Sequence, residues 1–340
     1  MKLTIIIRLV VSCLIGFSLI GCETRSDPDQ KSMQQIKLAL DWFPNANHAG
    51  LFLAIEKGYF AEEGLEVSAY TPENPASILQ TVGTGADDFG INYQPDLLLA
   101  RDKGVPVISV AGIVQSPLNS VMTLRSSGLK RPRDLEGKKI GYPGIPLNEP
   151  MLDTMLKNDG LMEGLEQVEL VNVGFNLGAS LISGQVDACV GCFWTYESIA
   201  MKNQGFPVEI MRMEDWGVPP YYELILVTNE DMHNNESKTI QKFVNAIIRG
   251  YTEASRDPQA AVDSLIRAHP EVDPEIDRLG ADLLAPLWKG DMPRVGWQSE
   301  VRWKEFALWM QNNRLIDNNM DVSKAYSNSY VTKIPAENLD

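Results

Sequence analysis

The sequence is poor in metal-binding side chains and in positive charge. Its 340 residues include only three histidines and four cysteines, and no close group of them resembles a complete zinc site of about four nitrogen or sulfur ligands. Lys and Arg number 30 against 45 Asp and Glu, so the formal charge is -15. Binding to nucleic acid needs Lys and Arg to neutralise phosphates, and this chain has no basic cluster. These shortages argue against a metal centre and against nucleic acid as a partner.

Long apolar runs are also missing, except at the N-terminus. There, Lys2 and Arg8 precede the run LVVSCLIGFSLIG, which ends at Gly21-Cys22. The run is too short for a convincing membrane span of ~20 residues, and its end resembles the bacterial lipobox. We therefore predict a lipoprotein signal peptide over 1–22, with lipid attached at Cys22, and a flexible tether over 23–35. The alternative is an ordinary signal peptide with an incidental cysteine.

A lipid on Cys22 would hold the mature protein on a membrane surface without a spanning helix. We expect the protein to lie in the cell envelope, on the periplasmic or extracytoplasmic face. No other part of the sequence approaches the length of a membrane span.

Two cysteines remain in the expected mature chain, Cys189 and Cys192, in the stretch DACVGCFW. We interpret them as small buried residues of a strand. A redox pair and half of a metal site are the alternatives, and a disulfide stays open if the protein is outside the cytoplasm.

Strands and helices alternate along most of the chain. Strands are predicted at IKLAL, LEVSAY, DDFGI and VPVISVAGIV, and the pattern restarts at Asn119 with NSVMTLR, KKIGY, VELVNV, DACVGCFW, VEIMRM and YELILVTN. Asn74 and Asn148 are predicted to cap helices. After Asn229 the pattern predicts only helices, at 237–255, 258–268, 274–287 and 298–313. Their tryptophans are expected to pack in the core; these are Trp288, Trp297, Trp303 and Trp309.

One short pattern occurs twice. Gly85-x-x-Asp88 and Gly184-x-x-Asp187 each follow a predicted helix and precede a predicted strand. Together with the alternation, this repeat indicates an α/β protein of two similar lobes, each with a mostly parallel sheet. Ligands of such sheets bind at the carboxyl ends of the strands, so we expect the site in a cleft between the lobes.

Three stretches carry a family resemblance: LDWFPNANHAGLFLAIEKGYFAEEGLEV at 40–67, DFGINYQPDLLLARDKGVPVISVAGIVQSPLNS at 88–120 and VDACVGCFWTYE at 186–197. They resemble the thiamine-pyrimidine family of periplasmic-binding-like proteins, and the likeness runs from about residue 36 to 314. It implies a two-lobed type II periplasmic-binding-protein-like fold with a central ligand cleft. We expect the first lobe to comprise 36–121 and 226–340, and the second 122–225.

The resembled family has two branches. One holds the solute-binding components of ABC importers that take up formylated or hydroxymethylated aminopyrimidines. The other is a thiamine pyrimidine synthase that uses pyridoxal phosphate, iron and its own histidine. The synthase needs a lysine and a histidine where this chain has Asn92 and Asp96.

Other synthase features are missing too. The stretch WGVPPYYELIL lacks the synthase cysteine cluster, and two prolines in the loop 141–148 remove N–H groups that a phosphate would need. We therefore predict a protein that is not an enzyme and has no cofactor and no metal.

The same resemblance and the aromatic side chains of residues 40–48 suggest where a flat ring would bind. We predict that Trp42 and Tyr93 sandwich the ring and that Glu197 accepts hydrogen bonds from its amine and a protonated ring nitrogen. Each could instead be structural: Trp42 as a lid on the core, His48 as a packing residue and Glu197 as a solvated acid. The remaining expected binding residues are Asp41, Asn45, His48, Asn119, Asn148, Glu149, Trp194, Tyr221, Tyr222 and Glu223.

The predicted function is a membrane-anchored substrate-binding protein of an ABC importer. It would bind formylaminopyrimidine or hydroxymethylpyrimidine, for thiamine salvage or biosynthesis, and present it to permease and ATPase subunits. The alternatives are the synthase, or the same scaffold with another solute such as riboflavin, a sulfonate, nitrate or taurine.

Overall fold

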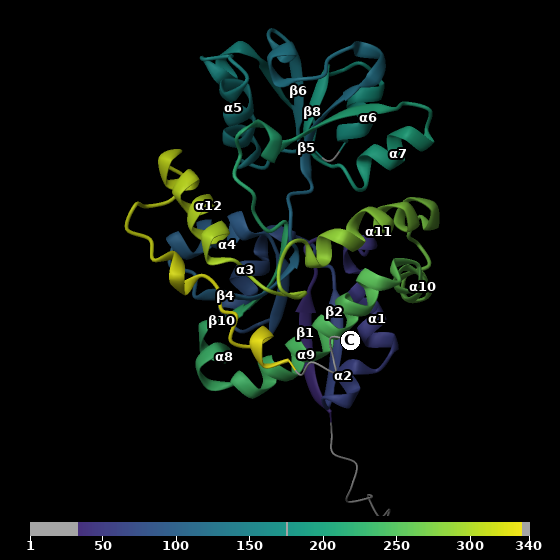
Figure 1. The fold of residues 1–340 in the computed structure, drawn as a ribbon, viewed down its shortest axis with the longest axis vertical. Coiled ribbons are helices and arrows are strands. Elements are labelled where there is room, and N and C mark those ends of the chain that lie inside the picture. The colour runs from purple at the N-terminus through teal and green to yellow at the C-terminus, as the bar shows by residue number, and fades with distance from the viewer. Residues whose placement is uncertain (1–32, 175, 335–340) are drawn as a thin grey trace, which may run out of the picture. The chain divides into compact units, whose positions relative to one another are not determined.

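The computed structural model describes residues 33–174 and 176–334 and contains two five-stranded sheets (Figure 1). The first has the order β2-β1-β3-β10-β4 and the second β7-β6-β8-β5-β9. The strands of the first sheet are β1 Gln34–Ala39, β2 Leu65–Tyr70, β3 Phe89–Asn92, β4 Val107–Val114 and β10 Leu224–Asn229. Those of the second are β5 Asn119–Leu124, β6 Lys139–Tyr142, β7 Glu169–Asn172, β8 Ala188–Phe193 and β9 Val208–Arg212. Each predicted strand is present, which confirms a two-sheet α/β fold.

The helices follow the predicted alternation and then the predicted helical C-terminal part. The α-helices are α1 Ala49–Glu56, α2 Tyr59–Glu62, α3 Ile78–Gly83, α4 Gln94–Asp102, α5 Asn148–Asn158, α6 Leu177–Ile182, α7 Glu197–Asn203, α8 Glu230–Asn235, α9 Ser237–Arg256, α10 Pro258–Ala268, α11 Pro274–Lys289 and α12 Glu300–Asn312. Short 3-10 helices are η1 Ala46–His48, η2 Pro75–Ser77, η3 Arg125–Ser127, η4 Pro132–Leu135, η5 Gly164–Gln167, η6 Met213–Trp216, η7 Val322–Lys324 and η8 Val331–Lys333. Among the described residues, none of these helices has the length and apolar character to cross a bilayer.

The two sheets have the same topology. The chain passes from the first sheet to the second between β4 and β5, and returns to the first between β9 and β10. Strands β10 and β5 occupy the same place in their sheets and run antiparallel to both neighbours, whereas the pairs of β1 and of β6 are parallel. The other four strands of each sheet therefore run in one direction, which confirms mostly parallel sheets. The single exception in each sheet is the strand that enters from the other sheet and so arrives in the opposite direction. The predicted boundary after residue 121 falls inside β5, so the first crossing lies before Asn119.

The repeated G-x-x-D pattern has the same structural role in both sheets. The carboxylate of Asp88 accepts a hydrogen bond from the backbone N–H of Lys37 at 2.8 Å, and that of Asp187 accepts one from Lys139 at 2.9 Å. Lys37 lies in β1 and Lys139 starts β6, so each aspartate ties its own strand to the equivalent neighbour. Glycine precedes both at a positive φ, 75° at Gly85 and 73° at Gly184, which a side chain would disfavour. This repeat confirms that the lobes share one construction.

The long helix α9 packs against α1 at a point where only glycine fits. A Cβ added to Gly250 would lie 2.3 Å from the carbonyl oxygen of Gly50. The backbones of the two helices therefore touch, which fixes α1 and the loop that precedes it. The predicted burial of tryptophans is confirmed for Trp288 and Trp303, which have no exposed surface, and for Trp309.

Two local predictions are wrong, one is confirmed and one falls outside the described residues. Strand β1 begins at Gln34, so the expected tether cannot extend to residue 35. Asn148 does not cap α5; Leu147 has the cap position and the Asn148 side chain bonds elsewhere. Asn74 does cap its helix, with its side chain accepting from the N–H of Ala76. The predicted signal peptide and Cys22 lie outside the described residues.

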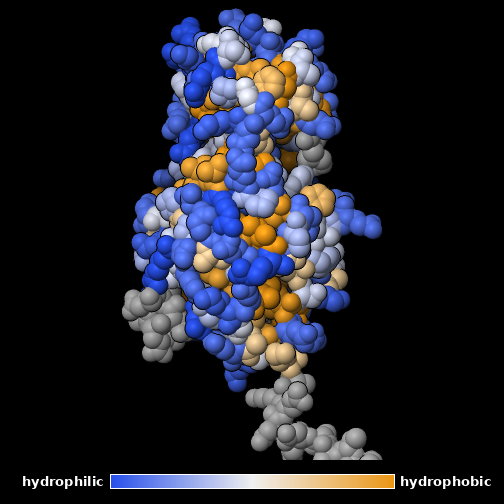
Figure 2. Space-filling model, turned by 90° about the vertical axis from the view of Figure 1, so that its right-hand side faces the viewer, coloured by the Kyte–Doolittle hydropathy of each residue, from blue (hydrophilic) through white to orange (hydrophobic). Residues whose placement is uncertain are grey.

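The surface is mostly hydrophilic, with apolar side chains gathered in patches on the face in Figure 2. Two exposed apolar residues recur below because they line a cavity: Phe43, 67% exposed, and Ile145, 44% exposed.

Candidate functional site

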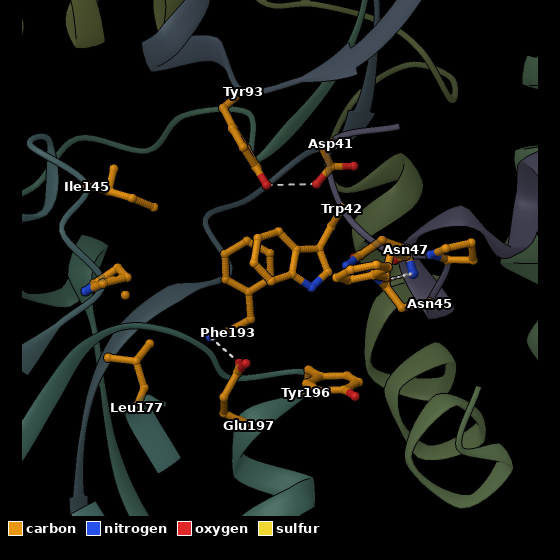
Figure 3. A pocket seen from close by; sticks show the side chains of 14 residues that line it. Asp41, Trp42, Asn45, Asn47, Tyr93, Ile145, Leu177, Phe193, Tyr196 and Glu197 are labelled. Atoms are coloured by element: carbon orange, nitrogen blue, oxygen red, sulfur yellow. Dashed lines mark hydrogen bonds between the residues drawn. The ribbon is translucent and has the colours of Figure 1, made fainter. Parts of the chain in front are cut away.

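A cavity of about 240 Å³ lies where the carboxyl ends of β1, β3, β6 and β8 meet (Figure 3). It therefore takes residues from both sheets, as the sequence predicted for a ligand of an α/β fold. Its lining residues are Asp41, Trp42, Phe43, Pro44, Asn45, Asn47, Tyr93, Pro143, Ile145, Leu177, Gly191, Phe193, Tyr196 and Glu197.

The Asp41 carboxylate is held by two neighbours. Its Oδ2 accepts a hydrogen bond from the Tyr93 hydroxyl at 2.8 Å, and its Oδ1 lies 2.9 Å from Nε2 of His48. The Nδ1 of His48 accepts from the backbone N–H of Asn45 at 3.3 Å, so the ring proton belongs on Nε2 and points at Asp41. Burial and the nearby Asp41 raise the pKa of the Tyr93 hydroxyl well above its usual range, so Tyr93 stays a donor. Asp41 is thereby fixed as an acceptor at the cavity wall.

The turn that carries Trp42 is stiffened by its own polar groups. The Asn45 side chain accepts from the N–H of Asn47 at 2.9 Å and donates to the carbonyl of Phe43 at 2.8 Å. The N–H of Ala46 donates to Asp277 of α11 at 2.7 Å. Because this network holds the backbone, the two aromatic side chains can remain partly exposed in a polar turn.

Aromatic rings form much of the cavity. Trp42 and Phe43 contact each other edge to face, with ring centroids 6.0 Å apart. In Figure 3, Trp42 and Phe193 lie between Tyr93 and Asp41 on one side and Glu197 on the other, and Tyr196 lies on the Glu197 side. Such a lining suits a flat ring with polar edges.

Glu197 begins α7 and reaches back to the end of β8. Its Oε2 accepts a hydrogen bond from the N–H of Phe193 at 2.7 Å. Burial raises the pKa of this carboxyl to about 7, although the hydrogen bond from Phe193 opposes the shift. Near neutral pH the group can therefore gain or release a proton at small cost, and it faces the cavity.

A second, smaller compartment of about 90 Å³ adjoins the cavity and shares Tyr93, Ile145, Gly191 and Phe193 with it. It is lined further by Pro95, Asp96, Asn119, Leu147, Asn148, Met151, Tyr221 and Glu223.

Glu223 ties the two crossing segments together at this compartment. Its Oε2 accepts from the backbone N–H groups of Leu118 and Asn119, at 2.6 and 3.2 Å, and from the Tyr221 hydroxyl at 3.1 Å. Burial raises the pKa of Glu223 to about 7 and that of Asp96 to about 6.

Most of the predicted site residues line one of the two compartments. Asp41, Trp42, Asn45, Tyr93 and Glu197 line the main cavity, and Asn119, Asn148, Tyr221 and Glu223 line the inner one.

The other predicted site residues lie outside both linings. His48 is fully buried and supports Asp41 from behind. The indole N–H of Trp194 donates to the carbonyl of Pro117 at 3.0 Å, and its ring stacks under the Arg212 guanidinium. The hydroxyl oxygen of Tyr222 accepts a hydrogen bond from the backbone N–H of Ser299 at 2.6 Å. Glu149 is half-buried on α5.

Several lining residues were not predicted. Asn47, Ile145, Leu177, Gly191, Phe193, Tyr196 and Asp96 belong to this group. Phe193 ends β8 and Tyr196 directly precedes Glu197, so the end of this strand carried a usable signal. Nothing local distinguishes Leu177 or Ile145 from core residues.

The cysteine pair lies behind the cavity wall. Cys189 and Cys192 are buried, are not joined by a disulfide, and have their sulfur atoms 2.7 Å apart. This confirms two buried residues of a strand. Within residues 33–174 and 176–334, no group of three or more His, Cys, Asp and Glu side chains could hold a metal ion.

Solved structures share this fold. The alkanesulfonate-binding protein SsuA of Xanthomonas axonopodis pv. citri, bound to MOPS, aligns with a TM-score of 0.66 at 16% identity, over 86% of this chain and 98% of that one. The periplasmic nitrate-binding protein NrtA of Synechocystis PCC 6803 aligns with a TM-score of 0.68 at 13% identity, over 91% of both chains. These likenesses confirm the predicted periplasmic-binding-protein fold.

Sequence relatives are more similar. The formylaminopyrimidine-binding protein of Halalkalibacterium halodurans is 37% identical, over 96% of this chain and 99% of its own length. A putative thiamine biosynthesis protein of Haemophilus influenzae is 33% identical, over 83% and 88%. The 4-amino-5-hydroxymethyl-2-methylpyrimidine phosphate synthase THI13 of Saccharomyces cerevisiae is 29% identical, over 72% and 74%.

A family model described as NMT1/THI5 like matches residues 45–261, which hold most of the cavity lining. With this match and the relatives above, the predicted resemblance is confirmed: the chain belongs to the NMT1/THI5-like family.

Proposed function

We propose that this protein is the substrate-binding component of an ABC importer and that its ligand is a thiamine-precursor aminopyrimidine. The observation that carries the proposal is the placement of two carboxyl groups, Asp41 and Glu197, at an aromatic cavity between the two sheets. An aminopyrimidine offers a flat ring, an exocyclic amine and basic ring nitrogens, so it needs stacking surfaces and acceptors at its edge. The relative named as a formylaminopyrimidine-binding protein supports the same ligand class.

Each lobe would contribute a different contact. Trp42, with Tyr93 near it, provides an aromatic face on the first lobe, and Glu197 provides the acceptor on the second. Because the ligand would touch both lobes, it would bind most tightly when they are closed around it, and differential affinity would drive closure. The closed, loaded form would then be presented to permease and ATPase subunits.

We further propose that the protein is not an enzyme. The synthase branch needs a lysine at the position where this chain has Asn92. The side-chain amide of an asparagine cannot form an imine with pyridoxal phosphate. Asn92 is buried at the end of β3, and its side-chain oxygen accepts from the N–H of Tyr93 at 2.8 Å. Asp96, at the position of the synthase histidine, lines the inner compartment.

The proposal is tested by calorimetric titration of the full chain with formylaminopyrimidine, hydroxymethylpyrimidine, thiamine, riboflavin and pyridoxal phosphate. We expect tight 1:1 binding of an aminopyrimidine and no signal from pyridoxal phosphate. A pyridoxal phosphate adduct with the absorbance of a Schiff base would favour the synthase instead. Tight riboflavin binding without pyrimidine binding would reassign the solute.

The location is a separate part of the proposal. We propose a lipid anchor on Cys22 and a position on the extracytoplasmic face of a membrane, from the N-terminal sequence and the periplasmic relatives of the fold. Cys22→Ser should move the protein from the membrane fraction to the soluble fraction without changing its affinity for ligand. Retention in the membrane fraction would contradict the anchor.

A further inference from the structure

The inner compartment, the smaller of the two at about 90 Å³, is lined by two asparagine side chains that each have one polar atom without a hydrogen-bond partner among the described residues. Asn119 begins β5 and Asn148 begins α5, so they come from different elements of the second lobe. The Nδ2 of Asn119 donates to the Oδ1 of Asn148 at 2.9 Å. The other two polar atoms, Oδ1 of Asn119 and Nδ2 of Asn148, are buried and have no partner among the described residues. Asn148 is only 2% exposed, and buried polar side-chain atoms in native proteins nearly always have a hydrogen-bond partner. The two unpaired atoms therefore need an explanation.

The chemical content of this pair does not depend on how the amides are oriented. The oxygen and nitrogen of an asparagine side chain are assigned from the hydrogen-bond network. If both amides were turned over, Asn148 would donate to Asn119. One donor and one acceptor would still remain unpaired. A group that fills the compartment must therefore accept one hydrogen bond and donate another.

The backbone next to the pair is shaped to keep the space open. Gly191 lines both compartments and has a φ of 98°, a conformation that disfavours side chains. A Cβ at Gly191 would lie 2.8 Å from Nδ2 of Asn148, the unpaired donor itself. The glycine thus keeps the wall next to that atom free of a side chain.

The charges around the compartment restrict its occupant further. Asp96 and Glu223 both line it, and the part of the chain described in the structure places no Lys or Arg in its lining. A phosphorylated arm would meet two carboxyl groups and no cation, which opposes its entry. At about 90 Å³, the compartment is much smaller than the 240 Å³ cavity, so it suits a short arm and not a second ring.

We propose that the inner compartment is a specificity subsite for a short, uncharged arm that carries an N–H and a carbonyl, as in an N-formylated aminopyrimidine. The ring occupies the main cavity beside Trp42, the carbonyl accepts from Asn148, and the N–H donates to Asn119. This inference rests on the proposed function, because it assigns the arm of the same ligand. A hydroxymethyl arm offers one oxygen for both partners and satisfies the pair less well. A phosphate arm is repelled.

The experiment is a calorimetric titration of the full chain with three ligands that share one ring: the formylaminopyrimidine, the hydroxymethylpyrimidine and its phosphate ester. We expect the affinity to fall in that order. Asn148→Leu keeps the approximate size of the side chain and removes its donor. It should weaken binding of the formylated ligand about tenfold and that of the hydroxymethyl ligand distinctly less.

Two further variants make the test specific. Asn158→Leu is the same substitution at an exposed position of the same helix and should leave all three affinities unchanged. The double variant Asn119→Leu, Asn148→Leu removes both unpaired atoms together. It should lose the preference for the formylated ligand. Its melting temperature should be unchanged or higher, because no asparagine of the pair is left buried without its hydrogen-bond partner.

The outcomes separate the subsite from the proposed function. If the wild-type chain binds pyrimidines but does not prefer the formylated one, or if Asn148→Leu weakens all ligands equally, the subsite is wrong and the importer function stands. Tightest binding of the phosphate ester would also overturn it. If no pyrimidine binds the wild-type chain, the proposed function fails and the subsite fails with it.

Discussion

The two lobes repeat one topology, yet the loops after their equivalent strands β1 and β6 differ. The loop after β1 is held by the Asp41–His48 and Asp41–Tyr93 contacts and by the bond from Ala46 to Asp277. The loop after β6 presents Ile145, which is 44% exposed, and the carbonyl of Ile145 accepts a backbone hydrogen bond from the N–H of Asn148 at 3.1 Å. The first lobe therefore offers a pre-organised surface, and the second offers apolar and amide groups that a ligand can complete.

Rigidity of the first lobe depends on the contact of α1 with α9, so breaking it should have the largest effect. In Gly250→Ala the new Cβ would meet the carbonyl oxygen of Gly50 at 2.3 Å, and backbone cannot move aside as a side chain can. We expect a loss of about 3 kcal/mol in the free energy of unfolding, measured by urea denaturation. The matched control is Gly178→Ala in α6 of the second lobe, where the new Cβ finds only Met201 at 3.5 Å. Equal losses in both variants would contradict the close contact.

Trp42→Ala tests the aromatic surface of the first lobe. It should weaken ligand binding by about 2–3 kcal/mol, because a stacked face and buried apolar area are lost together. The melting temperature should change little, since Trp42 is partly exposed. Ile145→Ala, on the equivalent loop of the second lobe, should cost about 1 kcal/mol. If Trp42→Ala retains full affinity in calorimetry, the ring stacks elsewhere, with Phe193 and Tyr196 as the remaining candidates.

Glu197→Gln tests the acceptor that the second lobe supplies. Hydrogen bonds to a charged group contribute more than neutral ones, so we expect a loss of about 2 kcal/mol in binding free energy. Glu166→Gln, at an exposed position of the same lobe, is the control. An affinity change of only a few tenths of a kcal/mol would remove Glu197 from the site.

The same variant should produce a smaller, pH-dependent effect on stability. Burial raises the pKa of Glu197 from 4.5 to about 7, so between these values the folded protein keeps a proton that the unfolded chain releases. Stability that is present below pH 4.5 is thus lost as the pH rises through about 7. Glu197→Gln cannot titrate, so its melting temperature relative to wild type should rise across this window and then level off. A difference that is flat with pH would contradict the raised pKa.

Much of the fold could be predicted because it follows from local patterns. Strand LEVSAY is β2 without any shift, and the repeated G-x-x-D marked an equivalence that both sheets confirm. The direction of β10 and β5 could not be predicted, because it depends on which sheet a strand joins and not on its own residues.

Only part of the site could be predicted, because some of its residues have no local signal in the sequence. Trp42 is an unusual side chain for a turn after a strand, and Glu197 is an acid that closely follows a strand, so both were found. Leu177 and Ile145 look like ordinary apolar residues. His48 was expected in the site and instead lies behind Asp41, fully buried. A sequence shows that a side chain can bond a ligand, but not whether another residue has already taken that bond.

The sequence by itself determined the class of the protein: alternating strands and helices, two similar lobes, an aromatic turn and a family membership. These features follow from periodicity and from residues that are close along the chain. Only the tertiary structure decided that Asn119 and Asn148 pair with each other and leave one donor and one acceptor unsatisfied. The two residues are 29 positions apart in the sequence, and hydrogen bonding depends on distances of a few tenths of an ångström that no local pattern encodes.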